Sequence, residues 1–262
     1  MIEIRNITKA YGKTTVVDDV SLTIERGGVV ALVGANGAGK STLLSLISRL
    51  LPATSGQVML DGQDIARTPG SILAQKLAVL RQDNSLTTRM SVEDLVSFGR
   101  FPHSKGHLTS EDRKQIEQAL QYLDLCSIRK DFLDEISGGQ RQRAFIAMSL
   151  SQNTDFLLLD EPLNNLDIKH AVTMMGVFRS MAEDLGKTIV VVLHDINFAS
   201  CYADRIIAMR EGRILHDGSS NDIIVPSVIR DIYGIDTSIH EIEGQKLVYY
   251  FKPINTPKAL SD

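Results

Sequence analysis

The sequence predicts an α/β protein built on a parallel β-sheet, and three observations lead to this prediction. Apolar runs without polar alternation occur at residues 29–33, 156–159 and 189–193, which is typical of strands buried on both faces of a parallel sheet. A helix-like stretch precedes each of the two later runs, which indicates a strand, helix, strand succession. With 262 residues, 43% of them hydrophobic, the chain has room for one large α/β domain or two small ones.

The first 35 residues alternate like an antiparallel strand pair. Ile2, Ile4 and Ile7 lead to a turn at Tyr11-Gly12, and residues 16–24 continue with an apolar residue at about every second position. The chain therefore begins with a small antiparallel β-subdomain before the first buried strand.

The middle of the chain changes to a helical pattern. Ile116, Leu120 and Leu123 follow a spacing of three and four residues, with charged residues between them. We expect an inserted α-helical subdomain over residues 85–153, so that the core consists of residues 1–84 and 154–262. A short helical stretch around 223–232 and a hairpin over 238–251 are expected near the C-terminus, with the hairpin turn at Glu243-Gly244.

Charge and hydropathy argue against several functions. Lys and Arg number 28 against 32 Asp and Glu, and this net charge of −4 argues against a nucleic-acid partner. The longest apolar runs have five residues, whereas a membrane span needs about 20. No signal-peptide pattern opens the chain, so we expect it to stay in the cytosol. Cys126 and Cys201 are then expected to be small buried residues without a metal or redox role.

A glycine-rich loop after the first buried strand predicts phosphate binding. Residues 34–42 read Gly-Ala-Asn-Gly-Ala-Gly-Lys-Ser-Thr and match the Gly-x4-Gly-Lys-[Ser/Thr] pattern in full. Glycines let successive N–H groups point at phosphate oxygens, and a helix beginning near Lys40 directs its positive end at the same place. Lys40 supplies charge to the outer phosphates, and the Ser41 hydroxyl is placed to bind Mg²⁺. The alternative is a glycine-rich turn with an incidental lysine.

This loop predicts a P-loop nucleotide-binding core, which a kinase, a GTPase or a motor would share. The expected nucleotide-binding residues of the loop are Gly34, Asn36, Gly37, Ala38, Gly39, Lys40, Ser41 and Thr42.

Two carboxylates follow the second buried run. Asp160 stands at the expected carboxyl end of the strand, where it can hold Mg²⁺ or its waters. Glu161, one residue later, points in a different direction and could polarise the attacking water as general base. A polar strand terminus would explain the pair equally well in isolation, but the phosphate loop favours the functional interpretation.

Residues 136–143, Ile-Ser-Gly-Gly-Gln-Arg-Gln-Arg, resemble the signature of ATP-binding cassette ATPases. Ser137 and Gln140 also fit a helix capping box. That interpretation leaves Gly138 and Gly139 unexplained, because each glycine costs a helix about 1 kcal/mol relative to alanine. The resemblance implies that the γ-phosphate of an ATP bound to a second subunit approaches this backbone. A complete site then needs two chains head to tail, with two ATP molecules between them.

Four further residues extend the resemblance, which covers about residues 1–220. Tyr11 matches the aromatic residue that stacks on adenine, and Gln82 matches the glutamine that touches Mg²⁺ and the attacking water. Asp167, in the segment Asn-Asn-Leu-Asp at 164–167, matches the loop that crosses to the opposite subunit, and His194 matches the histidine that contacts the γ-phosphate.

The resemblance therefore implies a P-loop NTPase core of the RecA-like type, with ATP and Mg²⁺ as cofactors. It implies Glu161, His194 and Gln82 as catalytic residues, Ser41, Gln82 and Asp160 as metal-binding residues, and Tyr11, Ser137, Gly138, Gly139, Gln140 and Asp167 as further nucleotide-binding residues. Ile136 and Leu163 depart from the usual residues at their positions, but neither is expected to touch phosphate.

A second, finer resemblance concerns the transported substrate. Residues 99–103, Gly-Arg-Phe-Pro-His, are similar to the Gly-Arg-x-Pro segment of cassettes that serve ferric-siderophore, haem and cobalamin importers, although a helix stop and turn explains the same residues. Residues 160–167 and 194–199 look closest to the iron–siderophore branch of catecholate type, such as enterobactin. Haem, cobalamin or another metal chelate is the alternative.

This branch implies a homodimer of ATPase subunits on the cytoplasmic face of the membrane. Its partners would be integral membrane permease subunits and, indirectly, a substrate-binding protein. Three other classes lack their sequence features here. A repair or translation cassette would need a coiled-coil insertion or a second cassette, a GTPase an Asn-Lys-x-Asp tetrapeptide, and an exporter fused membrane helices.

Overall fold

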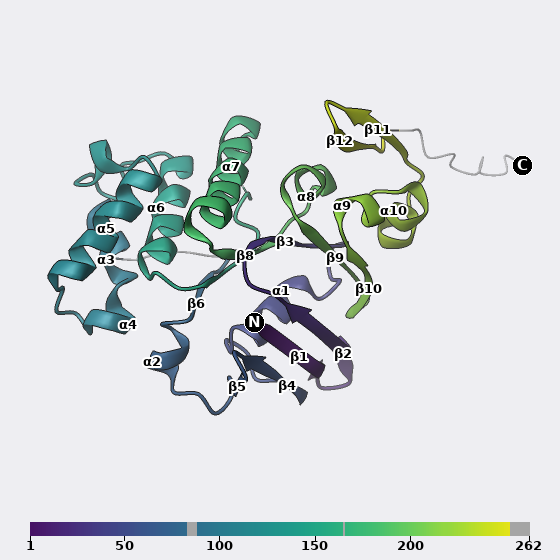
Figure 1. The fold of residues 1–262 in the computed structure, drawn as a ribbon, viewed down its shortest axis with the longest axis horizontal. Coiled ribbons are helices and arrows are strands. Elements are labelled where there is room, and N and C mark those ends of the chain that lie inside the picture. Colours follow the sequence, from purple (N-terminus) through teal and green to yellow (C-terminus); the bar gives the residue numbers. More distant parts are fainter. Residues whose placement is uncertain (83–87, 165, 252–262) are drawn as a thin grey trace, which may run out of the picture.

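A six-stranded sheet forms the centre of the computed structural model, which describes residues 1–82, 88–164 and 166–251 (Figure 1). The strand order is β10-β9-β3-β8-β7-β6, and all neighbours are parallel except the edge pair β9 and β10. The strands are β3 (Gly28–Val33), β6 (Leu77–Leu80), β7 (Phe156–Leu159), β8 (Thr188–Val192), β9 (Arg205–Arg210) and β10 (Arg213–Gly218). The three apolar runs lie side by side as β3, β8 and β7, which confirms the predicted parallel sheet.

Strand β3 shows why its apolar run has no polar alternation. Val29, Ala31 and Val33 pack into one hydrophobic cluster, together with residues of the helices on one face of the sheet. Val30 and Leu32 pack into a second cluster on the other face. Both faces of this strand are therefore buried, so a polar residue on either side would lose its contact with water.

A second, antiparallel sheet lies across from the central one, in the order β2-β1-β4-β5 (Figure 1). Its strands are β1 (Ile2–Tyr11), β2 (Thr14–Ile24), β4 (Ser55–Leu60) and β5 (Gln63–Asp64). The pairing of β1 with β2 confirms the expected N-terminal strand pair. Helix α1 (Lys40–Ile47) packs between the two sheets, where Leu43, Leu44 and Ile47 are buried in the second cluster.

The helical pattern of the middle region is confirmed, and its helices gather at one side of the central sheet (Figure 1). They are α3 (Val92–Phe98), α4 (Phe101–Ser104), α5 (Ser110–Tyr122), the 3₁₀ turn η1 (Cys126–Ile128) and α6 (Gly138–Ser151), while α2 (Gly70–Leu73) precedes β6. Val96, Leu120 and Ile146 are fully buried where α3, α5 and α6 meet. The predicted boundary between residues 84 and 85 lies outside the described residues.

Helices α7 (Ile168–Leu185) and α8 (Ile196–Tyr202) follow, and then α9 (Ser220–Ile223) and α10 (Pro226–Tyr233). The predicted C-terminal hairpin is confirmed as β11 (Ser238–Ile242) and β12 (Gln245–Tyr249), whose turn places Glu243 and Gly244 at positive φ. Val248 of this hairpin exchanges backbone hydrogen bonds with the Asn197 side chain of α8. The hairpin thus packs against the core.

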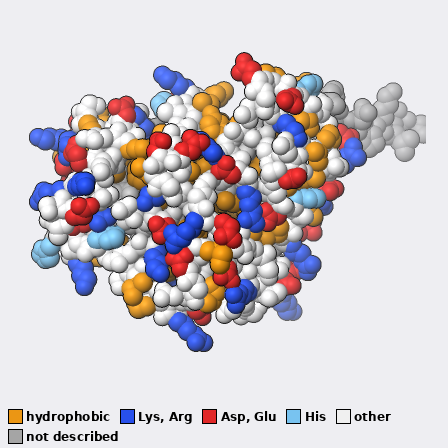
Figure 2. Space-filling view, in the orientation of Figure 1, with side chains coloured by type: hydrophobic (Ala, Val, Ile, Leu, Met, Phe, Trp, Pro, Cys, Tyr) orange, Lys and Arg blue, Asp and Glu red, His pale blue; other side chains and the backbone are white. Residues whose placement is uncertain are grey.

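The surface mixes charges of both signs, and acidic and basic side chains alternate over the face drawn in Figure 2. None of the described helices has the length and apolar character needed to cross a bilayer.

The prediction that both cysteines are buried is wrong for Cys126, whose side chain is exposed. Cys201 is half-buried. Cys126 opens the 3₁₀ turn η1, which follows α5 at the surface of the helical region, so no neighbouring element covers its side chain.

Candidate nucleotide-binding site

The glycine-rich loop joins β3 to α1 and is held by two neighbouring strands. Gly34 has φ +143°, and a Cβ atom there would lie 2.2 Å from the carbonyl oxygen of Met209 in β9. Gly39, the N-cap of α1, has φ +98°, and its Cβ would lie 2.6 Å from the carbonyl oxygen of Val16 in β2. Only glycine fits these two positions, so the loop is packed tightly against the strands behind it.

Helix α1 begins at Lys40, as the sequence predicts. The first N–H groups of a helix have no partner within it, so they and the helix dipole favour an anion at this end. Lys40 is 5% exposed, and its Nζ donates hydrogen bonds to the carbonyl oxygens of Gly34 at 2.8 Å and Ala35 at 3.0 Å. Burial lowers the pKa of Lys40, while the nearby Glu161 and Asp160 carboxylates favour its charged form. A positive charge is thus held inside the curl of the loop.

Ser41 and Asp160 bring two oxygen ligands together. The Ser41 hydroxyl donates to Oδ1 of Asp160 at 2.7 Å, and this contact joins the start of α1 to the end of β7. Burial raises the pKa of Asp160, and the neighbouring Glu161 carboxylate raises it further, although the Ser41 hydrogen bond acts in the opposite direction. A hydroxyl and a buried carboxylate are the hard oxygen ligands that Mg²⁺ binds, so these residues fit the expected cation.

Glu161 and His194 meet across the ends of β7 and β8. Glu161 has φ +50°, which lies in the left-handed region of backbone conformation. The Nε2 atom of His194 lies 2.8 Å from Oε1 of Glu161, and the Asn164 side chain donates to the other carboxylate oxygen. Both oxygens of Glu161 are therefore held in place.

These residues surround a cavity of about 480 Å³ that opens to solvent. Its lining consists of Val16, Asn36, Gly37, Ala38, Gly39, Lys40, Ser41, Thr42, Gln82, Glu161, Asn164 and His194. Ten of these twelve residues are site residues predicted from the sequence, drawn from four separate segments of the chain. Val16 was not anticipated from the sequence, because only the packing of β2 brings it here. Asn164 belongs to the predicted segment 164–167, but its amide was not selected as a site residue.

Tyr11 lies outside this lining. Its side chain is 50% exposed at the end of β1, and the Nζ atom of Lys9 lies 5.0 Å from the centre of its ring. An exposed aromatic face beside the loop is available for stacking, but the described geometry leaves it apart from the cavity.

The predicted signature begins helix α6 and also lies apart from the cavity. Ser137 accepts a hydrogen bond from the Gln140 N–H at 3.2 Å, and the Gln140 side chain accepts one from the Ser137 N–H at 2.9 Å. The capping-box interpretation is therefore correct for these two residues. Gly138 has open space beside its α-carbon, whereas a Cβ atom on Gly139 would come within 3.0 Å of the His170 ring.

His170 connects the signature to Asp167, the N-cap of α7. Its backbone N–H and its Nδ1 each lie 2.8 Å from Oδ1 of Asp167. Those contacts turn the imidazole ring toward Gly139. His170 could not be selected from the sequence, because it belongs to no motif and its contact with Gly139 joins two separate helices.

The sheet order and the phosphate loop define the class of this protein as a P-loop NTPase. The family model described as "ABC transporter" matches residues 17–164. The chain is 49% identical to "Petrobactin import ATP-binding protein YclP" of Bacillus subtilis (strain 168), over 96% of this chain and 100% of that protein. It is 38% identical to "Ferric enterobactin transport ATP-binding protein FepC" of Escherichia coli (strain K12), over 92% of this chain and 91% of that protein.

A solved structure gives the same result. The dimeric post-hydrolysis state of the ATP-binding cassette MJ0796, bound to ADP and Pi, matches with a TM-score of 0.75 at 30% identity, over 84% of this chain and 99% of that one. The chain belongs to the ABC transporter family. Within that family it is an ATP-hydrolysing subunit.

Proposed function

We propose that this subunit hydrolyses ATP in the cavity beside Lys40 and that hydrolysis drives import of an iron–siderophore chelate. The observation that carries the site assignment is the meeting of Glu161 and His194, 2.8 Å apart, at a cavity lined by the phosphate loop. The likeness to proteins named for petrobactin and ferric enterobactin, over more than nine-tenths of the chain, supports the transport role.

The phosphate groups of ATP bind the loop between Gly34 and Thr42. The loop N–H groups and the first turn of α1 supply donors, and Lys40 supplies a positive charge from a buried position. Tyr11 stacks on the adenine ring outside the cavity. Mg²⁺ would be held by Ser41, Asp160 and Gln82, and when bound it neutralises charge on the outer phosphates.

Glu161 accepts a proton from the attacking water, and His194 contacts the γ-phosphate. A general base must be oriented as well as basic. The hydrogen bond from Asn164 and the contact with His194 restrict the Glu161 carboxylate to one orientation. Gln82 lines the same cavity, which supports its proposed contacts with the attacking water and with Mg²⁺.

A second copy of the chain completes the site. Ser137, Gly138, Gly139 and Gln140 start α6 outside the cavity lining, which supports contact with an ATP bound to another copy of the chain. In a head-to-tail homodimer this segment and Asp167 of one copy face the ATP held by the other. ATP then favours the closed dimer and ADP the open one, and this difference in affinity is what drives a conformational cycle.

We further propose that residues 1–84 and 154–262 act as the nucleotide-binding core and residues 85–153 as a helical subdomain. The packing of α3, α5 and α6 on one another supports this division. The dimer binds integral membrane permease subunits at the cytoplasmic face of the membrane, and a substrate-binding protein delivers the chelate to them.

The chelate itself is best tested first with petrobactin. The relative named for petrobactin import is 49% identical, and the relative named for ferric enterobactin is 38% identical, so the enterobactin-like expectation becomes the second choice. Haem, cobalamin or another metal chelate is the remaining alternative.

The first experiment replaces Glu161 by Gln in the full chain. Loss of the base should reduce phosphate release by about 100-fold to 10,000-fold, whereas ATP binding stays and a closed dimer accumulates on size-exclusion chromatography. Normal turnover by Glu161→Gln would contradict the assignment of Glu161 as base.

The second experiment measures uptake of radiolabelled iron–petrobactin, iron–enterobactin and cobalamin in cells that carry this chain with its permease. We expect ATP-dependent uptake of an iron chelate, and no uptake with Lys40→Ala. Uptake of cobalamin alone would overturn the iron assignment and leave the ATPase intact.

A further inference from the structure

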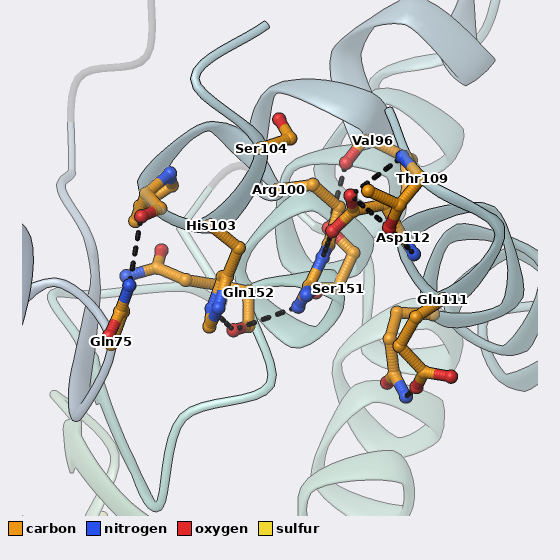
Figure 3. Close-up of polar contacts among 12 residues, drawn as sticks. Gln75, Val96, Arg100, His103, Ser104, Thr109, Glu111, Asp112, Ser151 and Gln152 are labelled. Carbon is orange, nitrogen blue, oxygen red and sulfur yellow. Dashed lines mark hydrogen bonds and ion pairs between the residues drawn. The ribbon is translucent and has the colours of Figure 1, made fainter. Parts of the chain in front are cut away.

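A buried ion pair in the helical region has no part in the mechanism described so far. Arg100 and Asp112 are 5% and 3% exposed, and Nε of Arg100 donates to Oδ1 of Asp112 at 2.8 Å. The other carboxylate oxygen accepts hydrogen bonds from the Thr109 N–H at 2.9 Å and hydroxyl at 2.7 Å. Figure 3 shows Arg100 between this carboxylate and the end of another helix. Removing either partner would leave a buried charge unpaired, so the pair resists separation.

The other side of Arg100 holds the C-terminal end of α6. Its Nη1 donates to the carbonyl oxygens of Ser151 at 2.8 Å and Gln152 at 3.3 Å, which a helix end leaves without intrahelical donors. Gly99 allows this approach, because a Cβ atom there would lie 2.0 Å from the carbonyl oxygen of Met148 in α6. The segment after α3 is therefore fastened to the end of α6.

Gln152 extends the connection into the central sheet. Its side-chain amide donates to the carbonyl oxygens of Ala74 and Leu77, at the start of β6. Its own carbonyl oxygen also accepts from His103 at 2.9 Å. Gln75, which precedes β6, forms a further hydrogen bond to segment 99–103, because its amide donates to the carbonyl oxygen of Pro102 at 3.0 Å (Figure 3). Segment 99–103, the end of α6 and the start of β6 thus form one hydrogen-bonded junction.

Two of the elements that meet at this junction, α6 and β6, lead at their other ends to segments predicted to contact ATP. Helix α6 has 14 residues and starts beside Ser137, so it is a rod of about 21 Å between the junction and the signature. Strand β6 ends at Leu80, whose carbonyl oxygen accepts from the Asp160 N–H at 2.9 Å, and Gln82 follows two residues later. A displacement at either predicted ATP-contacting segment therefore reaches the same junction.

We propose that Arg100 and Gln152 are positioning residues that couple ATP binding to movement of the exposed segment 98–101. The aromatic side chains of Phe98 and Phe101 flank Arg100 and are 57% and 58% exposed, so this segment is the outward end of the junction. The inference rests on the proposed function only in taking the cavity as the ATP site. Loss of the Gln152 amide removes both of its hydrogen bonds to Ala74 and Leu77 without changing a residue that lines the cavity. The Gln75 bond to Pro102 remains, so the link is weakened and not lost.

The test uses the absence of tryptophan from this sequence. Phe101→Trp in the full chain places a single tryptophan on the exposed segment, and its selectively excited emission is recorded with and without ATP and Mg²⁺. We expect an ATP-dependent emission change that falls about threefold to tenfold when Gln152→Leu is added. The matched control is Gln118→Leu, an exposed glutamine on α5 of the same region, which should keep the full change.

The same variants separate positioning from stability. Gln152→Leu should lower kcat for ATP by about threefold to tenfold while the KM for ATP stays within about twofold. A purely structural role would lower the melting temperature and leave the emission change of the folded molecules intact. Gln75→Leu, at an exposed position that cannot disturb the core, should reproduce a smaller loss and decides the matter if Gln152→Leu does not fold.

Full emission changes in both Gln152→Leu and Gln75→Leu would overturn the proposal. The proposal would also be overturned if the Phe101→Trp chain, with Gln152 and Gln75 unchanged, bound ATP without any change in emission. Failure of the chain without these substitutions to bind or hydrolyse ATP is a different result, and it would overturn the proposed function instead.

Discussion

The chain contains two glycine-rich helix starts, and they differ in what surrounds them. At α1 the N-cap is Gly39, which has no side chain to cap the helix, and Lys40 is buried behind it. At α6 the N-cap is Ser137, which forms a capping box with Gln140 at the exposed surface. The first start is enclosed by strands on two sides, and the second lies open.

The difference indicates how each start meets a phosphate. The loop before α1 keeps its N–H groups uncapped by side chains inside a cavity of about 480 Å³, so one chain is enough to bind there. Ser137 and Gln140 already cap the start of α6, and neither residue lines that cavity. In the proposed dimer, the approaching phosphate belongs to an ATP held by the other copy.

The largest effect is expected for Lys40→Ala, which removes the charge inside the enclosed start. Phosphate release should fall by about 100-fold to 1000-fold, because a preorganised charge that faces the outer phosphates is lost. Lys13→Ala, which replaces an exposed lysine on the turn between β1 and β2, should leave turnover unchanged in the same assay. Equal losses of turnover from Lys40→Ala and Lys13→Ala would contradict a specific role for the charge of Lys40 at the start of α1.

Ser137→Ala tests the open start. It removes a capping oxygen, which costs about 1 kcal/mol of stability, and it should also lower phosphate release by about tenfold or more. ATP binding by the isolated chain should remain, because Ser137 lies outside the cavity of its own chain. The matched control is Ser91→Ala, which removes the corresponding capping oxygen from α3 in the same region. A similar loss of activity from Ser91→Ala would reduce the role of Ser137 to capping.

Asp112→Asn should destabilise the helical region and spare the cavity. Burial opposes ionisation of Asp112, but hydrogen bonds from Thr109 and the Arg100 guanidinium outweigh it and lower the pKa to about 2. Because the folded pKa is depressed, this stabilisation of about 2 kcal/mol is present above pH ~4 and is lost as the pH falls toward about 2. The melting temperatures of wild type and variant should therefore differ at neutral pH and converge in acid. A constant difference across this range would contradict the ion pair.

The smallest effect on stability is expected for Gly138→Ala. This variant should raise the stability of α6 and lower ATP turnover. Gly138 does not have positive φ, and nothing lies within 4 Å of an added Cβ, so alanine fits and should stabilise α6 by up to about 1 kcal/mol. ATP turnover should nevertheless fall, because the added methyl group lies where a phosphate of the second subunit must approach. A variant that is more stable and equally active would show that no group approaches Gly138 closely.

Much of the fold could be predicted because its signals are local. Strands β3, β7 and β8 could be predicted from their apolar runs. Helix α1 begins at the predicted residue, because the glycine-rich loop determines where the helix starts. Strands β4 and β9 were not anticipated, since Ser55–Leu60 alternates weakly and Arg205–Arg210 is a short run between charged residues. Cys126 was misplaced because composition gives the usual burial of a residue type and not its position in a turn.

The candidate site likewise contains residues that local sequence signals identified and residues that they did not. Motifs identified the phosphate loop, Asp160, Glu161 and His194 because each stands where a strand ends. The role of His170 against Gly139 carries no such signal, and Arg100 was recognised only as part of a turn, with no indication that its partner is Asp112.

The sequence by itself determined the phosphate loop, the capping boxes and the buried strands, because each depends on residues within a few positions of one another. Only the tertiary structure decided that His194 lies 2.8 Å from Glu161 and that Gln152 joins the helical region to β6. Those contacts connect residues 33 and 75 positions apart, and their distances depend on how whole strands and helices pack. Residues close together in the sequence therefore determined the individual motifs and strands of this ATPase, and non-local packing determined the distances between them.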